Sequence, residues 1–362
     1  MMRGFIRLDA LLPEKVASFR GIAKLKGIST ICLIAPSMLR LPLVTLLFFM
    51  AFGCSREQSR PSQVDRQSQH SPVTVMATAI PAFSGKEAFG FLLRQTAFGP
   101  RNPGSPGHTS CLEYLGSALR ELADTVRLQE FTVPGYGGEQ LRLTNIIGSF
   151  RPELTNRILL CAHWDTRPRA DQDPDKNLRD KPIIGANDAA SGVAVLLEIA
   201  SLLKKNAPPV GVDIVFFDGE DYGKEGDTDR YLLGSRYFAS RARGEYSPRF
   251  GILLDMVGDS NLEIPREQNS MRFAPDVMNL VWNTARELGV SQFVDEPGEE
   301  IMDDHLPLNQ AGIKTIDLID FDYPDQTNRY WHTHQDTPDH CSPESLAAVG
   351  TVVTNVLFTQ HP

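Results

Sequence analysis

The sequence has few cysteines for its length. It contains five in 362 residues, and only Cys111, Cys161 and Cys341 lie beyond residue 54. An odd number without paired spacing predicts no disulfide framework. We expect buried free thiols, with a single disulfide as the alternative in an oxidising compartment.

Long hydrophobic runs are also scarce. The apolar run at 41–52 is about a dozen residues long, shorter than the roughly 20 that a membrane-spanning helix needs. It follows a basic stretch and ends in AFGC at Cys54, so residues 1–53 are predicted to be a secretion signal, with Met38 as a possible true start. The AFGC sequence resembles a bacterial lipoprotein cleavage box. We expect export to the cell envelope or periplasm with a lipid anchor at Cys54, or ordinary cleavage or an uncleaved anchor as alternatives.

Positive charge is in short supply after this leader. The whole chain has a formal net charge of −9 and the first 53 residues carry +5, which leaves −14 for the remainder. Such an acidic chain argues against nucleic acid or an anionic membrane surface as the main partner. Residues 54–82 are rich in Ser, Gln and Arg, which is typical of a flexible tether. Residues 83–362 are predicted to form the folded domain.

Hydrophobic patterning in this region alternates between strands and helices. The runs at 127–134 and 141–150 predict a hairpin of two strands. Four shorter apolar runs predict buried strands at 157–163, 213–218, 251–255 and 314–320. Helical periodicity predicts helices at 87–95, 109–123, 191–205, 235–242, 275–288 and from 343 on, with Ser191 as an N-cap. This order predicts a single-domain α/β fold with a central twisted mixed β-sheet flanked by helices.

Titratable residues follow three of the predicted buried strands. His163 ends one strand, Glu220 and Asp221 follow the next, and Asp255 ends a third. The carboxyl ends of strands are where open α/β sheets bind ligands, so we expect these groups to meet in one crevice. A single strand that ends in a charge is explained as well by its emergence into solvent, but three together favour a site.

Two further residues complete a metal-binding pattern. Asp188 lies in the turn GANDAASG before a helix, where the helix N-terminus favours an ionised carboxylate, although an ordinary capping Asp is the alternative. His332 lies in the loop YWHTHQDTPDH, a kind of segment in which functional residues concentrate. Two carboxylates and one His with a fourth position open form a catalytic zinc pattern, which predicts Asp188, Asp221 and His332 as ligands.

Glu220 is the predicted general base. Adjacent side chains after a strand point in different directions, so Asp221 can bind the metal while Glu220 faces the substrate. The alternative is that DGEDYGKEGDTD is an acidic surface loop or a calcium site. Its spacing does not match the calcium-loop pattern.

The ordered motifs of the chain resemble those of glutaminyl-peptide cyclotransferases and of their relatives, the zinc aminopeptidases. The resemblance runs from about Phe83 to the end and rests on FGPRNPGSPGH, CAHWDT, GANDAASG, FFDGED, LLGSR, LLDMVGD, MDDHLPL and WHTHQDTPD. It implies a zinc aminopeptidase-like fold. In the aminopeptidases two zinc ions are bound, which the resemblance assigns to His163, Asp188, Asp221, Asp255 and His332.

The cyclotransferases use one zinc ion, which the resemblance assigns to Asp188, Asp221 and His332. Three features favour this branch: Trp331 directly before the ligand histidine, the DDH stretch that starts at Asp303, and LLGSR after the acidic pair. Two features depart from the animal enzymes. Asp221 stands where they have Glu, and the loop after it lacks their tryptophan.

The resemblance also implies the remaining site residues. Asp303 joins Glu220 and Asp255 in a carboxylate network, and carboxylic acids packed together share protons and titrate as a set. Trp331 lines an apolar pocket, and we expect Ile301 and Tyr323 to bind substrate beside it.

The expected activity is conversion of N-terminal glutaminyl residues of peptides or proteins to pyroglutamyl residues with release of ammonia. The first alternative is a two-zinc aminopeptidase in which Glu220 activates water. A second is a catalytically inactive protein that captures peptide N-termini.

Overall fold

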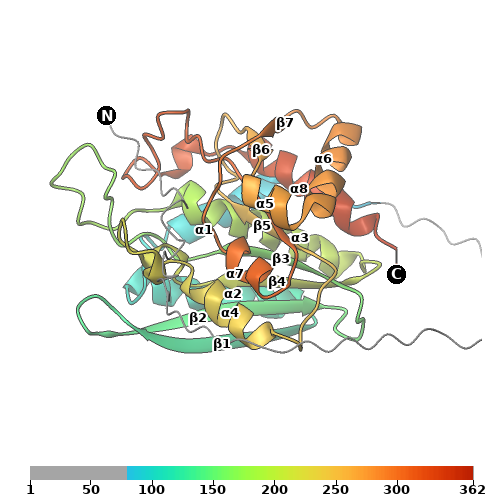
Figure 1. Ribbon diagram of the computed structural model, residues 1–362, viewed down its shortest axis with the longest axis horizontal. Coiled ribbons are helices and arrows are strands. Elements are labelled where there is room, and N and C mark those ends of the chain that lie inside the picture. Colours follow the sequence, from blue (N-terminus) through green and yellow to red (C-terminus); the bar gives the residue numbers. More distant parts are fainter. Residues whose placement is uncertain (1–79, 362) are drawn as a thin grey trace, which may run out of the picture. The chain divides into compact units, whose positions relative to one another are not determined.

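The computed structural model describes residues 80–361, so the predicted leader and most of the predicted tether lie outside the described residues (Figure 1). The strands are β1 Thr125–Pro134, β2 Gln140–Phe150, β3 Arg157–His163, β4 Gly211–Phe217, β5 Gly251–Asp255, β6 Ile264–Arg266, β7 Phe293–Pro297 and β8 Thr315–Ile319. The α-helices are α1 Gly85–Thr96, α2 Pro106–Leu122, α3 Gly192–Lys205, α4 Leu233–Ala242, α5 Gln268–Phe273, α6 Pro275–Leu288, α7 His305–Gln310 and α8 Pro343–Phe358.

Six strands form a mixed sheet in the order β1-β2-β4-β3-β5-β8. The hairpin β1-β2 and the pair β2-β4 are antiparallel, whereas β3 is parallel to both β4 and β5, and β5 is parallel to β8. The short strands β6 and β7 form a separate parallel pair. The prediction of a mixed sheet flanked by helices is confirmed.

Helices cover both faces of the sheet (Figure 1). Side chains alternate between the two faces of a strand, so Ile158 and Leu160 pack with α1, α2, α3, α6 and α8, while Leu159 and Cys161 pack with α4 and α7 on the opposite face. Helix α3 packs against α1, α2, α8 and the sheet, and most of its residues are therefore buried. Cys111, Cys161 and Cys341 are buried free thiols, as expected.

The long elements match the predicted ranges closely, and the helix predicted at 275–288 has those bounds. Within the described residues, two short α-helices, α5 and α7, and two short strands, β6 and β7, were not predicted by the sequence pattern. Each has three to six residues, too few for a helical or strand period to emerge. Helix α7 matters most, because it starts directly after Asp303 and Asp304.

Candidate active site

The candidate site lies where three neighbouring strands end. β3 runs parallel to β4 and β5 on either side of it, so their carboxyl ends meet at one edge of the sheet. His163 ends β3 and Asp255 ends β5, and His163 Nε2 lies 3.2 Å from Asp255 Oδ1. Glu220 follows β4, and its Oε2 lies 3.9 Å from His163 Nδ1. The structure therefore brings the groups at the predicted strand ends together.

A buried carboxylate holds the turn after β4. Asp165 Oδ1 accepts a hydrogen bond of 3.0 Å from the Glu220 N–H, and Asp165 Oδ2 accepts one of 3.4 Å from the Asp221 N–H. The residue before the turn, Gly219, has a φ of +77°, a conformation that favours glycine. The turn thereby presents two consecutive carboxylates at the sheet edge, both of them buried.

Asp188 lies in an irregular π-helical turn, Ala186–Ser191, before α3. Asp336 holds this turn, because its two oxygens accept the N–H groups of Asn187 and Asp188 at 2.8 and 3.2 Å. Ser191 takes the predicted N-cap position of α3, but its side chain accepts no capping hydrogen bond from the helix. Its hydroxyl donates instead to the Asn187 carbonyl at 2.5 Å, because the turn continues directly into the helix. Such π-helical turns often occur at functional sites.

Asp188, Asp221 and His332 meet, with their ligand atoms all within 4.8 Å of one another. His332 Nε2 lies 3.5 Å from Asp188 Oδ2 and 3.4 Å from Asp221 Oδ1. Asp188 also belongs to a second group with His163 and Asp255, and its Oδ1 lies 3.1 Å from His163 Nε2. Although burial opposes it, hydrogen bonds to His163 and His332 lower the pKa of Asp188. Asp188 is therefore ionised, as a metal ligand must be.

The first of these groups fits a zinc ion. Two carboxylates and one imidazole with a position left open are the donor set of catalytic zinc. Within the described residues, Asp221 Oδ2 is buried and has no hydrogen-bond partner. An unpaired buried carboxylate oxygen is costly, and a bound cation would satisfy it.

Several carboxyl groups surround Glu220. Burial, together with repulsion from Asp221 and Asp303, raises the pKa of Glu220 well above its usual range, although His163 opposes the shift. Burial and the neighbouring Asp255 raise the pKa of Asp303 to about 7. A set of this kind can take up and return a proton near neutral pH.

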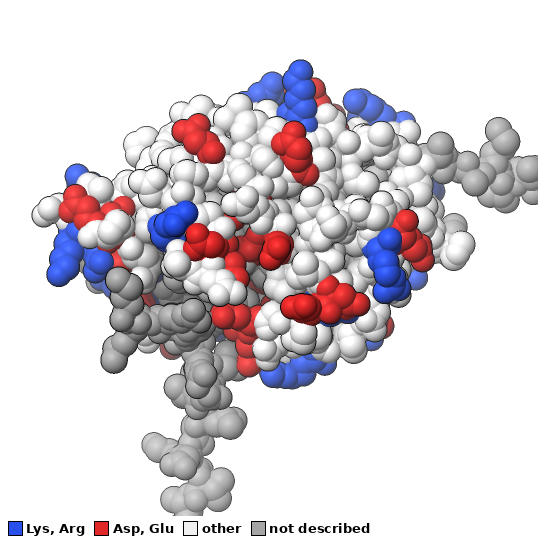
Figure 2. All heavy atoms as spheres, turned by 90° about the horizontal axis from the view of Figure 1, so that it is seen from above, with Lys and Arg blue, Asp and Glu red and all other residues white. Residues whose placement is uncertain are grey.

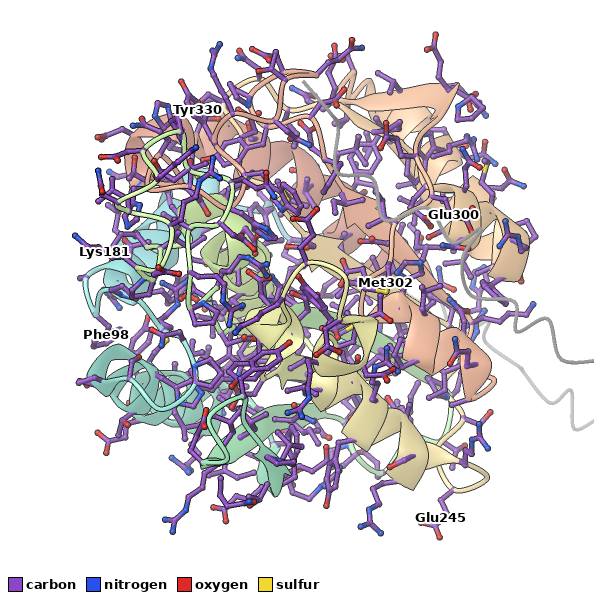
Figure 3. All side chains as sticks on the ribbon, turned by 60° about the vertical axis from the view of Figure 1, so that its left-hand side comes forward. Phe98, Lys181, Glu245, Glu300, Met302 and Tyr330 are labelled. Carbon is purple, nitrogen blue, oxygen red and sulfur yellow. The ribbon has the colours of Figure 1, made fainter. Side chains whose placement is uncertain are left out.

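A cavity of about 130 Å³ opens onto these groups. Eight carboxylates line it, whereas Arg167 is its one Lys or Arg among the described residues. Glu300, one of these eight, and Met302, which also lines the cavity, lie on the loop between β7 and α7 (Figure 3). The face in Figure 2 likewise carries Asp and Glu at its centre, with most Lys and Arg toward its rim. The cavity is small beside the roughly 300–1,000 Å³ of common ligand sites, so it suits one terminal residue.

One wall of the cavity is apolar. Trp331, Ile301 and Phe321 line it. The Trp331 ring stacks on the His332 imidazole with centroids 3.7 Å apart and meets Phe321 edge-on at 5.1 Å. His332 has a φ of +55°, which is uncommon for a residue other than glycine and is often found at functional sites.

Supporting residues complete the site. Tyr323, which we expected to bind substrate, is fully buried and is not among the lining residues. Its hydroxyl donates to Asp336 Oδ1 at 3.1 Å, so it supports the turn that carries Asp188. Asp336, Arg167 and Asp171 were not assigned a role from the sequence. Their only signal was their position, within WHTHQDTPD for Asp336 and directly after CAHWDT for Arg167.

Comparison with known proteins gives the class. The model of peptidase family M28 matches residues 145–357, and the chain therefore belongs to that family.

Individual relatives lie within the cyclase and exopeptidase branches. A glutaminyl cyclase structure from Bacteroides thetaiotaomicron, bound to N-acetylhistamine, is 42% identical with a TM-score of 0.73 and covers 78% of this chain and 99% of its own. A Zn-dependent exopeptidase from Parabacteroides distasonis is 40% identical with a TM-score of 0.75, at 78% and 100% coverage. A glutaminyl-peptide cyclotransferase-like protein from Bos taurus is 27% identical over 274 residues, which is 68% of each chain.

Proposed function

We propose that the protein is a glutaminyl-peptide cyclotransferase, an acyltransferase that converts N-terminal glutaminyl residues to pyroglutamyl residues. The observation that carries this proposal is the carboxylate set of Glu220, Asp255 and Asp303 beside a cavity sized for one residue. The resemblance to bacterial glutaminyl cyclases at about 40% identity supports it.

Asp188, Asp221 and His332 would hold one zinc ion. When bound, zinc supplies Lewis acidity that polarises the γ-amide carbonyl of the substrate.

The chain's own residues supply binding and proton transfer. The carboxylates of the cavity attract the α-amine of the substrate. Glu220 takes a proton from this amine as its nitrogen bonds to the amide carbon, and returns a proton to the side-chain nitrogen as that carbon–nitrogen bond breaks and ammonia leaves. Because nucleophile and electrophile belong to one residue, no water takes part. The enzyme mainly holds the folded-back conformer, and orientation of this kind contributes several kcal/mol or more.

The apolar wall of the cavity would orient the substrate and exclude water. Trp331, Ile301 and Phe321 would pack against the glutaminyl methylene groups. They would also keep water from the polarised carbonyl carbon, where its attack would give glutamate instead of the ring.

The two-zinc aminopeptidase is the second candidate. The group formed by His163, Asp188 and Asp255 favours it, because their ligand atoms also lie within 4.8 Å of one another. One of the similar structures is described as a Zn-dependent exopeptidase, a broader class that includes aminopeptidases.

Incubation of the purified protein with a Gln-initiated peptide tests the proposal. We expect release of ammonia and a product lighter by about 17 mass units, the mass of ammonia. Release of the free first residue, with two tightly held zinc ions per chain, would establish the aminopeptidase instead.

We also propose that the enzyme is exported and anchored to a bacterial membrane through a lipid on Cys54. The proposal rests on the sequence pattern of the leader, which lies outside the described residues.

A further inference from the structure

Arg167 makes a set of hydrogen bonds that has no role in the proposed mechanism. It lies in the loop after β3, is 1% exposed and lines the catalytic cavity. Its guanidinium donates to both carboxylate oxygens of Asp171 at 2.7 and 2.6 Å and to the Tyr231 hydroxyl at 2.9 Å. It also donates to Asp221 Oδ1 at 2.6 Å and to the Asp221 carbonyl at 3.3 Å. Every N–H of the planar fork therefore has a partner.

These contacts reach two of the three proposed zinc ligands. Arg167 contacts Asp221 directly. Its other carboxylate partner, Asp171, places Oδ1 3.8 Å from His332 Nδ1, while the opposite ring nitrogen of His332 faces Asp188 and Asp221. In metal sites the second ring nitrogen of a ligand histidine is commonly met by a carboxylate, which fixes the orientation of the ring.

The orientation of Asp221 depends on the same group. Its Oδ1 accepts from Arg167 and faces His332 Nε2 at 3.4 Å, whereas its Oδ2 has no hydrogen-bond partner within the described residues. Among the described residues, Arg167 makes the shorter of the two side-chain contacts to this oxygen, at 2.6 Å against 3.4 Å for His332.

We propose that Arg167 is a positioning residue that presets Asp221 directly, and His332 through Asp171, in the geometry that binds zinc. The inference rests on the metal site of the proposed function. Both the cyclotransferase and the aminopeptidase need that site, so the inference does not depend on which reaction is catalysed.

The charge of Arg167 and its positioning role act on zinc affinity in opposite directions. A guanidinium beside a ligand carboxylate repels a second cation, so loss of its charge alone would strengthen zinc binding. Loss of orientation weakens binding, typically by 10–100-fold for a supporting residue of this kind. The direction of the change therefore identifies the role.

Arg167→Lys in the full-length chain separates the two effects. Lys keeps the charge, but as a single flexible ammonium it cannot donate to Asp171, Asp221 and Tyr231 in the geometry of the fork. We expect zinc affinity, measured by competition with a chromogenic chelator, to fall by about 10–100-fold. Asp171→Asn is expected to weaken zinc binding less, because Asp171 lies 3.8 Å from His332, whereas Arg167 lies 2.6 Å from Asp221. An unchanged or higher affinity of folded Arg167→Lys protein would overturn the proposal.

Arg157→Lys is the matched control. Arg157 is also largely buried and donates to both oxygens of one carboxylate, that of Asp213, at 2.8 and 2.6 Å. Since it starts β3, at the opposite end from His163, this variant should lose stability and keep the zinc affinity of the wild type. If Arg167→Lys does not fold, Asp171→Asn and Tyr231→Phe test the same network with smaller changes, and wild-type affinity in both would refute it.

The zinc assay and the cyclisation assay distinguish failure of the Arg167 proposal from failure of the proposed function. A wild-type protein that binds zinc tightly but releases no ammonia would refute the proposed function and leave the role of Arg167 open to the same affinity test. A folded wild-type protein that binds no zinc would overturn the role of Arg167 whatever its activity.

Discussion

His163 Nε2 lies 3.2 Å from Asp255 Oδ1, so the two groups that a second zinc ion needs are already bonded to each other. The same nitrogen lies 3.1 Å from Asp188 Oδ1. His163 therefore bridges the carboxylate set and the proposed ligands. In a one-zinc enzyme its role is to hold the two carboxylates, and in a two-zinc enzyme it binds metal.

Two matched histidine variants distinguish these roles. We expect the wild type and His163→Gln to hold one zinc ion per chain, whereas His332→Gln loses it, because only His332 belongs to the proposed one-zinc ligand set. Elemental analysis after dialysis measures the metal. Two ions in the wild type and one in His163→Gln would favour the aminopeptidase.

Glu220→Gln tests the proton-transfer role. Gln keeps the size of the side chain but cannot accept the amine proton, so we expect kcat to fall by about 10²–10⁴-fold. Zinc content should stay at the wild-type value. In Asp221→Asn, by contrast, zinc should be lost along with activity. Near-normal turnover by Glu220→Gln would assign the proton to another carboxylate of the set.

Variants of Trp331 test the role of the apolar wall of the cavity. We expect Trp331→Ala to lower kcat/KM for a Gln-initiated peptide by about 100-fold, because the substrate loses its oriented, water-free conformer. Zinc content should change much less, and Trp331→Phe should recover part of the activity by restoring a ring. A loss of zinc that matches the loss of activity would mean that Trp331 acts mainly by packing on His332.

Much of this site was predictable because it lies at the ends of buried strands. The runs that end at His163 and Asp255 are continuous and apolar, which predicts parallel neighbours in the centre of a sheet and hence a shared edge. The helices α1, α3, α6 and α8 likewise carried a clear helical period.

The residues that support the proposed metal ligands through hydrogen bonds were not predictable from the sequence. Arg167 meets Asp221 across 54 positions of sequence, and Asp336 meets Asn187 across 149. The local hydrophobic periodicity of the sequence does not indicate such contacts, because a buried polar residue has the same sequence pattern around it whichever residue it contacts. Ser191 shows the same limit at short range, since the π-helical turn before α3 gives its hydroxyl a different partner from the one that a cap would have.

The lipid anchor gives a prediction about localisation. In a bacterial host with a lipoprotein pathway, we expect the wild-type chain in the membrane fraction and Cys54→Ser in the soluble envelope fraction, because the thiol is the site of acylation. Fractionation and mass spectrometry of the mature N-terminus measure both. Cys32→Ser, within the predicted leader, is the control and should leave the membrane association unchanged. A membrane-bound Cys54→Ser protein would indicate an uncleaved anchor.

Glu198, on α3 and not among the residues that line the cavity, gives a prediction about stability. Burial raises its pKa to about 7. In the unfolded chain the carboxyl releases its proton at lower pH, so the ionised form favours unfolding increasingly as the pH rises from about 4.5 to 7. We expect Glu198→Gln to stabilise the folded protein by about 1–2 kcal/mol at pH 8 and to have little effect at pH 4.5.

Denaturant unfolding of the zinc-loaded protein at the two pH values measures this difference. Glu113→Gln, on the exposed side of α2, removes the same charge from a solvated position and should change stability equally little at both. Gln also keeps an oxygen that can accept the Ser84 N–H, so the change isolates the charge. A stabilisation by Glu198→Gln that is equal at pH 4.5 and pH 8 would show that packing, not ionisation, distinguishes the two side chains.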